Sequence, residues 1–477
     1  MPQQNFVDRH QELRFLKDRH ATDTAECIVL YGRRRVGKTS LLLEFLKGRP
    51  GIYFLASEEG DARNIREFAH HAALFLHDPA FEQPQYADWN SLFSAFIHHT
   101  GFANRQPGKK VVIAIDEFPY LIARNPAIPS VFQKCWDENL SGAPVMLILS
   151  GSSVSTMETE VLGTASPLYG RRTGQWQVQP LPYPCIRQFV PYSPEECAMT
   201  WFVLGGIPAY LRQFDPKKPF WENVQASILS RGAYLATEGD LLLTYEFREP
   251  ANYRVIFRAL ASGCTTLGDI CNETGLDKGM VSKYLSVLTR LHIVHDEIPV
   301  TASPKFRKRH YLITDPYLSF YFRYIIPNRI DLEADRTGEV LERIQGTFPG
   351  YAGGMFEQLT AHLIRTKLLL PDLHFTTLGR WWYQEQEIDL VGLDDTADRI
   401  LFCECKWRDL SHADAKRILL DLEKKSAEVR WRNDRREELF CLVGKHILGK
   451  EKLRAEGYRV HDLADVPLDT PGSRPSP

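Results

Sequence analysis

The sequence predicts an α/β protein of several domains, beginning with a parallel sheet and ending with a smaller α/β unit. Two observations lead to this fold class. The chain has 477 residues, a length that favours about three domains rather than one. Near residues 27–46 an apolar strand, a glycine-rich loop and an apolar helix follow one another, and helix and strand patterns alternate again after residue 346.

The composition is that of an ordinary globular protein, with 44% hydrophobic and 25% charged residues. The formal net charge of −2 gives no general attraction to nucleic acid, so any such binding requires local basic patches. The nine cysteines include no CxxC pair and the polar start is unlike a signal peptide, so we expect reduced thiols in a cytoplasmic protein. Without an apolar run of about 18 residues, we expect no membrane partner.

The first predicted strand, Cys27–Tyr31, leads into the loop "GRRRVGKT" and then into the apolar helix Leu41–Leu46. The loop fits G-x-x-x-x-G-K-[ST] in the context that a phosphate-binding P-loop requires. Its glycines let backbone N–H groups surround a phosphate, and the helix N-terminus adds its positive dipole end. We expect Lys38 to reach the β- and γ-phosphates and the Thr39 hydroxyl to bind Mg²⁺. At least one of the loop's three arginines is expected simply to be solvated. The predicted nucleotide-binding residues of the loop are Gly32, Arg33, Arg34, Arg35, Val36, Gly37, Lys38, Thr39 and Ser40.

The second predicted strand, Val111–Ile115, is an unbroken apolar run, as in a parallel sheet covered on both faces. It ends in Asp116 and Glu117, which after a P-loop have the pattern of a Walker B pair. We expect Asp116 to hold Mg²⁺, directly or through water, and Glu117 to orient the attacking water as the catalytic base.

The polar end, 150–153, of the third predicted strand, 144–153, leaves two interpretations open. Ser150 lies where a sensor hydroxyl would face the γ-phosphate, or it belongs to a plain strand-to-loop turn. Farther along, the segment "LYGRR" supplies Arg171 and Arg172. Either one could act as an arginine finger on the developing phosphoryl charge, or both could bind solvent or acidic neighbours.

The middle of the chain is predicted to be helical and then to form a winged helix-turn-helix. Residues 181–248 have helical patterns interrupted by a Gly-Gly-Ile-Pro sequence, and they predict an all-α lid. In 249–326, apolar residues at helical spacing precede two strand patterns joined by the basic connection "PKFRKRH". Beside a recognition helix, this connection could contact nucleic acid phosphates, DNA being the expected form, or the module could be a scaffold or bind a protein partner. The basic residues of the connection are Lys305, Arg307, Lys308 and Arg309.

Residues 346–468 form a predicted α/β unit with a set of acids and one lysine. In the strand "LFCECKW", Glu404 and Lys406 share one face because side chains alternate along a strand. Asp389 lies on the preceding strand, and Glu357 lies on the helix before it. Carboxylate oxygens suit Mg²⁺, and a lysine beside them can orient a nucleophile. An ordinary strand-end ion pair between Glu404 and Lys406 is the alternative. The predicted metal ligands are Glu357, Asp389 and Glu404, and the predicted catalytic residues are Asp389, Glu404 and Lys406.

Several N-terminal segments together resemble the archaeal/bacterial ATPase family within the AAA+/STAND group of P-loop proteins. They are "FVDRHQELRFL", "GRRRVGKTS", "VVIAIDEFPYL", "LILSGSS", "LYGRR" and "VLGGIPAYL", in the order typical of that family, across about residues 5–215. The resemblance implies that ATP is the nucleotide and is hydrolysed. It also places Arg9 near the adenine pocket.

The C-terminal acids resemble those of the PD-(D/E)XK nuclease superfamily, in the form of a domain of unknown function, DUF234, often fused to such ATPases. Glu357 matches the helical acid, Asp389 the first strand acid, and Glu404 with Lys406 the E-x-K signature, although Ile388 precedes Asp389. The resemblance implies either a metal-dependent nuclease or an inactive fold that only binds. Other acids on the face of Asp389 are Glu385 and Glu387.

The predicted organisation is a P-loop ATPase core (1–180), a helical lid (181–248), a winged helix-turn-helix (249–326), a linker (327–345), a restriction-endonuclease-like α/β domain (346–468) and a disordered tail (469–477). Our leading hypothesis is that the ATP cycle gates a Mg²⁺-dependent nuclease-like domain acting on nucleic acid. The alternative is an ATP-dependent regulatory switch that binds DNA or a protein through the winged helix and carries an inactive nuclease fold. An arginine finger acting between subunits would require a homo-oligomer.

Overall fold

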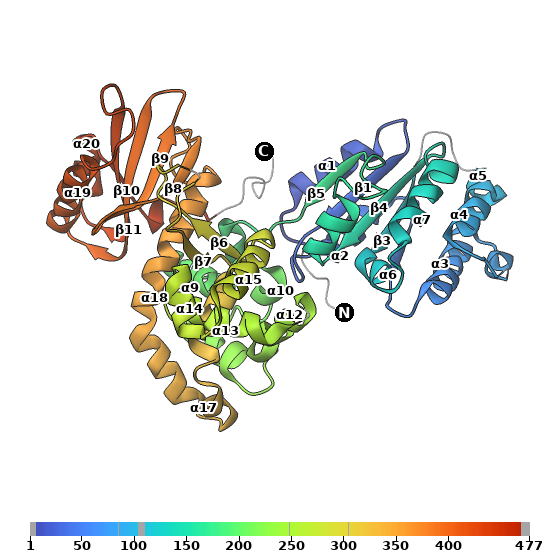
Figure 1. The fold of residues 1–477 in the computed structure, drawn as a ribbon, viewed down its shortest axis with the longest axis horizontal. Coiled ribbons are helices and arrows are strands. Elements are labelled where there is room, and N and C mark those ends of the chain that lie inside the picture. Colours follow the sequence, from blue (N-terminus) through green and yellow to red (C-terminus); the bar gives the residue numbers. More distant parts are fainter. Residues whose placement is uncertain (1–5, 84, 104–109, 248, 304, 469–477) are drawn as a thin grey trace. The chain divides into compact units, whose positions relative to one another are not determined.

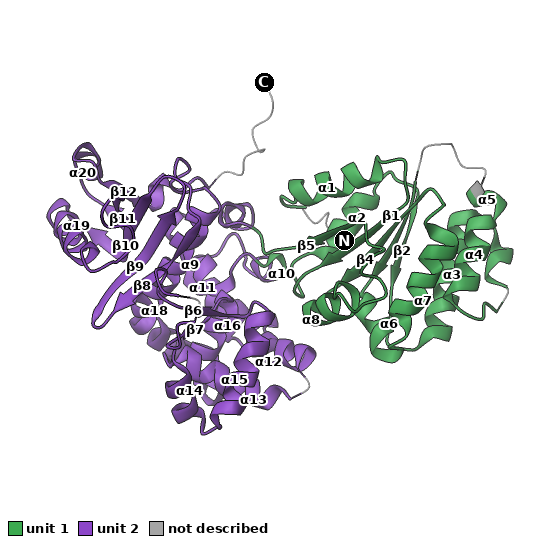
Figure 2. Cartoon of the chain, turned by 45° about the horizontal axis from the view of Figure 1, so that its top comes forward, with its two compact units in different colours: residues 1–181, 207–209 green, residues 182–206, 210–477 purple. Residues whose placement is uncertain are grey.

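The computed structural model describes residues 6–83, 85–103, 110–247, 249–303 and 305–468. The predicted disordered tail, 469–477, lies outside these residues. The chain divides into two compact units (Figure 2). Unit 1 comprises residues 1–181 and 207–209, and unit 2 comprises residues 182–206 and 210–477.

Unit 1 is built on a five-stranded sheet with helices beside it (Figure 1). All neighbouring strands are parallel, and every residue of the three central strands is buried. Burial on both faces explains why these strands read as continuous apolar runs, and the predicted parallel sheet is confirmed. In sheet order the strands are β2 (Gly51–Leu55), β3 (Val111–Asp116), β4 (Val145–Gly151), β1 (Glu26–Tyr31) and β5 (Gly174–Gln177).

The helices of unit 1 pack through a cluster of aromatic rings beside β2. Phe68 of α3 lies edge-on to Phe54 of β2, and Trp89 of α4 contacts both rings. These aromatic contacts add to the apolar area that the helices bury against the sheet. The helices are α1 (His10–His20), α2 (Lys38–Leu46), α3 (Asp61–Leu76), α4 (Trp89–His98), α5 (Thr100–Ala103), α6 (Phe118–Arg124), α7 (Ile128–Cys135) and α8 (Val154–Thr156), with shorter helical turns at Pro79–Glu82, Trp136–Leu140 and Met157–Val161.

The first part of unit 2 is helical, as the sequence predicts. Helix α9 begins with a capping box between Ser193 and Glu196 and ends before Gly205, whose φ of 60° terminates the helix. Helix α10 then starts at Pro208, because proline is accommodated in the first turn of a helix. The helices are α9 (Pro194–Leu204), α10 (Pro208–Leu211), α11 (Phe220–Val224) and α12 (Tyr234–Glu246), with shorter turns at Tyr183–Gln188 and Gln225–Leu229.

Three helices and a two-stranded antiparallel sheet come next in unit 2. Helix α14 ends at Gly275, which has a φ of 69°, and the Asp277 side chain caps the following helix by accepting from Gly279 N and Met280 N. The two short strands pair along their whole length, from Val294 opposite Ile313 to Glu297 opposite His310. These elements are α13 (Pro250–Ala261), α14 (Leu267–Thr274), α15 (Lys278–Arg290), β6 (Val294–Glu297) and β7 (His310–Ile313).

A long helix, α18 (Thr337–Arg365), precedes the C-terminal sheet. Residues 327–345, for which the sequence suggests a linker, contain α17 (Arg329–Glu333) and the first turns of α18. The apolar stripe of α18 continues on the N-terminal side of Pro349, where Val340, Ile344 and Phe348 are buried at helical spacing. Between β7 and α17 lie α16 (Pro316–Phe320) and the turn Tyr321–Ile325.

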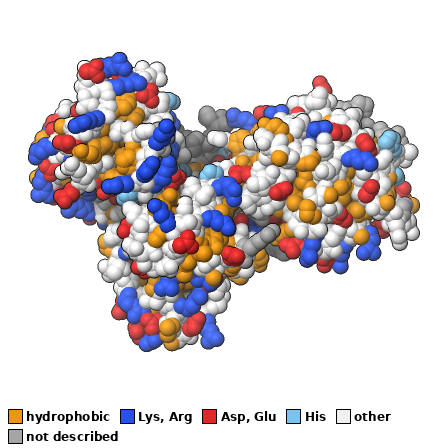
Figure 3. Space-filling model, viewed as in Figure 1, with side chains coloured by type: hydrophobic (Ala, Val, Ile, Leu, Met, Phe, Trp, Pro, Cys, Tyr) orange, Lys and Arg blue, Asp and Glu red, His pale blue; other side chains and the backbone are white. Residues whose placement is uncertain are grey.

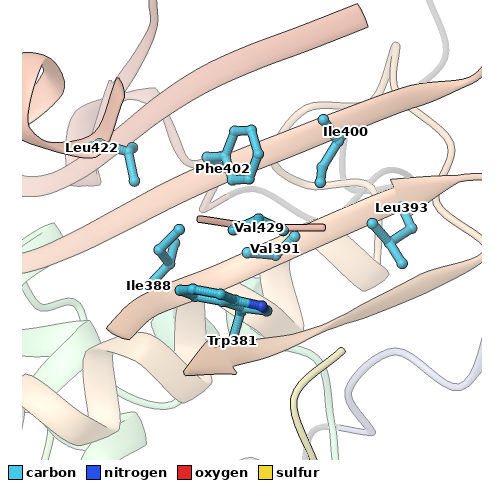
Figure 4. Packing of buried hydrophobic residues seen from close by; sticks show 8 residues of the cluster. All are labelled: Trp381, Ile388, Val391, Leu393, Ile400, Phe402, Leu422 and Val429. Carbon is cyan, nitrogen blue, oxygen red and sulfur yellow. The ribbon is translucent and has the colours of Figure 1, made fainter. Parts of the chain in front are cut away.

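The C-terminal sheet is separate from that of unit 1 and has the strand order β12-β11-β10-β9-β8. Strands β8, β9 and β10 form an antiparallel meander, and β11 returns parallel to β10 after α19. Buried side chains of β8, β9, β10 and the α19 region form one apolar cluster, among them Trp381, Ile388 and Phe402 (Figure 4). The elements are β8 (Thr377–Tyr383), β9 (Gln386–Asp394), β10 (Arg399–Leu410), α19 (His412–Ser426), β11 (Glu437–Ile447), α20 (Lys450–Ala455) and β12 (Arg459–Asp462), with a final turn at Leu463–Asp465.

Within the described ranges, no helix is both long enough and apolar enough to cross a membrane.

Candidate nucleotide site and candidate metal-dependent site

The P-loop joins β1 to α2 and depends on its two glycines. A Cβ atom on Gly32 would lie 2.4 Å from the carbonyl oxygen of Val178, so no larger residue fits there without a shift. Gly37 has a φ of 96° and is the last residue before α2. That left-handed conformation is easy for glycine and costly for other residues. The loop therefore presents its backbone at the N-terminal end of α2, where phosphate is bound in P-loop proteins.

Arg9 braces the P-loop from the segment before α1. Its guanidinium donates to the carbonyl oxygens of Val36 and Gln179, each at 2.7 Å, and pairs with Glu12 at 2.9 Å. Only 5% of Arg9 is exposed. The carbonyls that it binds belong to the loop and to the segment after β5, so Arg9 holds both in register. The sequence pointed to Arg9 as a nucleotide neighbour, and the structure adds this bracing role.

Lys38 lies folded over the loop. Its Nζ donates to the carbonyl oxygens of Gly32 at 2.8 Å and Arg33 at 2.9 Å, and the residue is 5% exposed. These bonds keep the ammonium group at the loop that would surround the phosphates. Its contact with the β- and γ-phosphates stays a prediction.

Asp116, at the end of β3, is fully buried and surrounded by hydroxyl groups. Its carboxylate accepts from Thr39 Oγ1 at 2.6 Å, Ser150 Oγ at 2.7 Å and Tyr53 OH at 3.1 Å. Burial, then the charge of Asp116, raises the pKa of Tyr53, so its hydroxyl stays protonated and donates. The Thr39 hydroxyl and the Asp116 carboxylate form an oxygen donor pair of the kind that Mg²⁺ prefers.

Glu117 has a φ of 54°, in the left-handed region, and α6 begins directly after it. Such a conformation is strained for a residue other than glycine and is concentrated at functional sites. Its Oε2 accepts from Ser152 Oγ at 2.7 Å and Ser152 N at 3.3 Å. Ser152, like Tyr53, was not singled out from the sequence. The sequence signal that could have indicated Ser152 is its position directly after β4, two residues beyond Ser150.

The two candidate arginine fingers have partners away from the P-loop. Arg171 pairs with Asp137 at 2.9 Å, and Arg172 donates to the carbonyl of Leu162 at 3.0 Å while lying over the ring of Tyr169. Within the described part of unit 1, neither bonds to the P-loop or to the acids after β3. The partners of both arginines are therefore known, and these contacts give neither one a catalytic role.

Residues Ile207–Ala209 belong to unit 1 although the chain on either side belongs to unit 2. Pro208 lies beside the P-loop, because a Cβ on Gly37 would be 3.9 Å from Pro208 Cγ. This short segment therefore connects the P-loop directly to the polypeptide of unit 2.

In the C-terminal sheet, Lys406 joins two of the predicted acids. Its Nζ lies 3.0 Å from Asp389 Oδ2 and 2.5 Å from Glu404 Oε2. Burial lowers the pKa of Lys406, but Asp389 and Glu404 outweigh that effect and hold the pKa above its ordinary value. Glu404 is 4% exposed, and its other oxygen accepts from Lys425 of α19 at 2.8 Å. The structure thus brings Asp389, Glu404 and Lys406 together, and it adds Lys425.

Glu357 faces a different set of charges. It forms an ion pair with Arg380 of β8, which also pairs with Glu387 at 3.2 Å. Burial, and then the charge of Asp389, raises the pKa of Glu357 to about 7, although Arg380 opposes the shift. Neither Lys425 nor Arg380 was predicted. The paired lysines at the end of "LLDLEKK" were the only sequence signal for Lys425.

These ion pairs determine how the acids are spaced. Among the described residues, no three His, Cys, Asp or Glu side chains converge closely enough to hold a metal ion. Asp389 and Glu404 are bridged by an ammonium group, and Glu357 is engaged by a guanidinium group. The two carboxylates around Lys406 remain a suitable oxygen pair for Mg²⁺, while Glu357 is paired with Arg380.

The fold and the site of unit 1 define a P-loop nucleotide hydrolase: a parallel sheet, a glycine-rich loop before α2 and an acidic pair at the end of β3. Residues 6–214 match an ATPase domain predominantly from Archaea, and residues 321–418 match a domain of archaeal and bacterial proteins of unknown function. The chain belongs to the family of archaeal and bacterial ATPases that combine these two domains. Unit 1 therefore carries an ATPase domain.

The chain is also similar to individual proteins. The chain is 37% identical to an uncharacterised protein of Methanocaldococcus jannaschii over 449 residues, which cover 94% of this chain and 97% of the relative. Over 44 residues, 9% of this chain and 75% of the relative, it is 50% identical to an uncharacterised ATP-binding protein of the same organism. A Walker-type ATPase of Pyrococcus abyssi has a similar fold, with a TM-score of 0.51, 21% identity, and coverage of 67% of this chain and 96% of that one.

Proposed function

We propose that this ATPase uses its nucleotide cycle to control a Mg²⁺-dependent nuclease-like domain acting on nucleic acid, DNA being the expected form. The observation that carries the proposal is the meeting of Asp389, Glu404 and Lys406 on the adjacent strands β9 and β10 of the C-terminal sheet. An acid pair with a bridging lysine, placed on adjacent strands, has the chemistry needed to position water at a phosphodiester.

At the ATP site, the proposed roles follow from the contacts of each side chain. Lys38 would exchange the carbonyl oxygens of Gly32 and Arg33 for the β- and γ-phosphate oxygens of ATP. Glu117 would orient the attacking water, with Ser152 holding its carboxylate in place. Mg²⁺ held by Thr39 and Asp116 would neutralise phosphate charge.

Coupling between the units would pass through Ile207–Ala209. Pro208, the first residue of α10, lies beside the P-loop at Gly37, and α10 continues into unit 2, where Tyr210 OH donates to Glu238. A change in the loop on ATP binding would therefore shift a segment that is covalently continuous with unit 2. This route requires no other interface between the units.

At the second site, Lys406 would orient or stabilise the nucleophile, while Asp389 and Glu404 would hold Mg²⁺, which lowers the pKa of bound water. The helices α13–α15 with the β6–β7 strands would act as a winged helix that delivers nucleic acid. The support for this delivery role is the basic connection between β6 and β7, in which Arg307 and Lys308 are exposed.

A regulatory switch with an inactive nuclease fold is the second candidate, and one observation favours it. Both oxygens of Glu404 are engaged by lysines, and Glu357 is engaged by Arg380. An enzyme site of this kind must release carboxylate oxygens for a metal, whereas a binding domain can keep them in ion pairs. In that case nucleic acid would be bound and not cut.

The test incubates the full-length protein with single- and double-stranded DNA and RNA, with Mg²⁺ or Mn²⁺, with and without ATP. We expect cleavage that Glu404→Gln and Lys406→Met reduce by roughly 10²–10⁴-fold. Glu451→Gln, which alters an exposed carboxylate paired with Arg454, is the matched control and should cleave normally. Binding without cleavage would support the switch instead.

A further inference from the structure

A groove of about 1260 Å³ lies within unit 2, between the β6–β7 connection and the β8–β9 hairpin. One wall comes from α14, the start of α15, residues 299–302 and residues 306–311, the last of which include most of the basic connection. The other wall comes from the end of β8 and from the residues after α19. The groove therefore joins the two modules that the proposed function assigns to nucleic acid.

The lining is strongly positive. Lys278, Arg307, Lys308 and Arg430 line the groove and are exposed, and within the described residues none of the four forms an ion pair. A single carboxylate, that of Glu428, belongs to the lining. Figure 3 shows Lys and Arg side chains spread over unit 2 on the face it presents. Unpaired cations on opposite walls suit a polyanion running along the groove.

Aromatic rings line the same groove as these cations. Tyr383, the last residue of β8, is 53% exposed, and the half-buried Trp382 ring lies 4.7 Å from the His310 ring, centroid to centroid. Trp381, buried to 3% exposure in the core cluster, anchors the same strand. The rings are thus presented by a paired strand rather than by a free loop, so little ordering is needed when a planar group stacks on them.

The same strand leads to the acid site. Trp382 pairs across the hairpin with Glu387, whose carbonyl oxygen accepts from Lys425 at 3.0 Å. Lys425 in turn binds Glu404. A ligand lying on Trp382 and Tyr383 would therefore be one strand away from Asp389 on β9 and two strands away from Glu404 and Lys406 on β10.

We propose that this groove binds single-stranded nucleic acid, with bases stacked on Tyr383 and Trp382 and phosphates held by the cations of both walls. Exposed ring faces among unpaired cations are what a single strand requires, because its bases have free π-faces. In a duplex those faces are covered by neighbouring base pairs. The inference rests on the proposed nucleic-acid role of unit 2, but it does not depend on cleavage.

The test measures binding of labelled single-stranded DNA, single-stranded RNA and duplex DNA of one sequence to the full-length protein by fluorescence anisotropy, without divalent metal. We expect tighter binding of a single strand than of the duplex. Tyr383→Ala should weaken single-strand binding roughly five- to hundredfold, and Tyr383→Phe should preserve it. Tyr245→Ala, which removes a tyrosine that is 59% exposed on α12, should have no effect.

A second variant tests the phosphate contacts. Arg307→Ala combined with Lys308→Ala should weaken binding and reduce the salt slope of log K by about 1.4 for a single strand. The pair Arg417→Ala and Lys424→Ala removes the same charge from α19 and should leave the slope unchanged.

The outcomes separate this inference from the wider proposal. Duplex binding equal to single-strand binding, with Tyr383→Ala silent, would overturn the groove while leaving the nucleic-acid role intact. Absence of binding to every oligonucleotide would overturn both. Equal losses in the test and control variants would show general charge attraction and would also overturn the groove. The DNA and RNA arms identify which single strand is preferred.

Discussion

Asp116 depends on hydroxyl groups from three different segments. A fully buried carboxylate is costly unless hydrogen bonds replace its hydration, and Thr39, Ser150 and Tyr53 provide them. The sequence pointed to Thr39 and Ser150 because both follow recognisable strands and motifs. It gave no reason to choose Tyr53, which reaches Asp116 because β2 and β3 are paired in one particular register.

Lys38→Ala should reduce ATP turnover by at least roughly 100-fold, because the proposed contact with the transferred phosphoryl group would be lost. Turnover is measured by phosphate release, with folding checked by circular dichroism. Lys47→Ala, which removes an exposed lysine paired with Glu44 just after α2, is the control and should keep normal turnover. Unchanged turnover in Lys38→Ala would contradict the assignment of the P-loop.

At the scale of elements, Asp240 of α12 ties several helices together. It accepts from Arg254 of α13 at 2.9 Å and Tyr321 OH at 3.0 Å, and it pairs with Arg329 of α17. Burial raises the pKa of Asp240, but the bonds from Arg329 and Tyr321 outweigh it, so the pKa lies below its ordinary value. No sequence pattern joins these residues, because they are brought together only by helix packing.

Asp240→Asn should therefore lower stability by about 1–2 kcal/mol near pH 7, a figure reduced for partial solvent screening. A depressed folded pKa stabilises above the unfolded pKa of about 3.9, and this contribution is lost as the pH falls through the folded value. The difference from the wild type should thus begin to shrink below about pH 4 and be lost only as the pH falls below the folded pKa of Asp240. The stability difference is measured by hydrogen exchange of the α12 amides at several pH values.

The matched control is Asp421→Asn, since Asp421 is an exposed partner of Lys424 on α19. This substitution should leave the hydrogen exchange of the α12 amides unchanged at every pH. A destabilisation by Asp240→Asn that persisted unchanged at pH 3 would show that the lost ionic contacts are not its cause.

Helix α18 is longer than its sequence pattern predicts. The helix carrying Glu357 was predicted from its amphipathic pattern, but its extension back to Thr337 was not. Pro349 and several glycines in this stretch suggest interruption, since both residue types disfavour a helix interior. The buried stripe of Val340, Ile344 and Phe348 outweighs that local preference through tertiary packing.

At the scale of the whole molecule, the units are joined by three crossings of the chain, around residues 181–182, 206–207 and 209–210. This connectivity follows from the return of Ile207–Ala209 to unit 1. The segment beside the P-loop is therefore covalently bonded to unit 2 at both of its ends, although the two units contain separate sheets.

An arginine finger supplied by a neighbouring copy would make turnover depend on assembly. We expect ATP turnover per molecule to rise with protein concentration, and light scattering to show a larger mass when Glu117→Gln is loaded with ATP. Arg171→Ala or Arg172→Ala should abolish the rise, because the finger's charge on the developing phosphoryl group is then missing. Arg124→Ala, an exposed arginine beside Glu58, is the control. Concentration-independent turnover at constant mass would contradict this prediction.

The sequence by itself determined the P-loop, the acidic pair after β3, the parallel sheet and the presence of a second α/β unit. These depend on local patterns, in which strand burial, glycine conformations and motif spacing act over a few residues. Only the tertiary structure decided which side chains meet. Tyr53 and Ser152 bind the acids of the nucleotide site, while Lys425 and Arg380 engage those of the second. Those contacts depend on strand register and helix packing between distant segments, which no local pattern specifies.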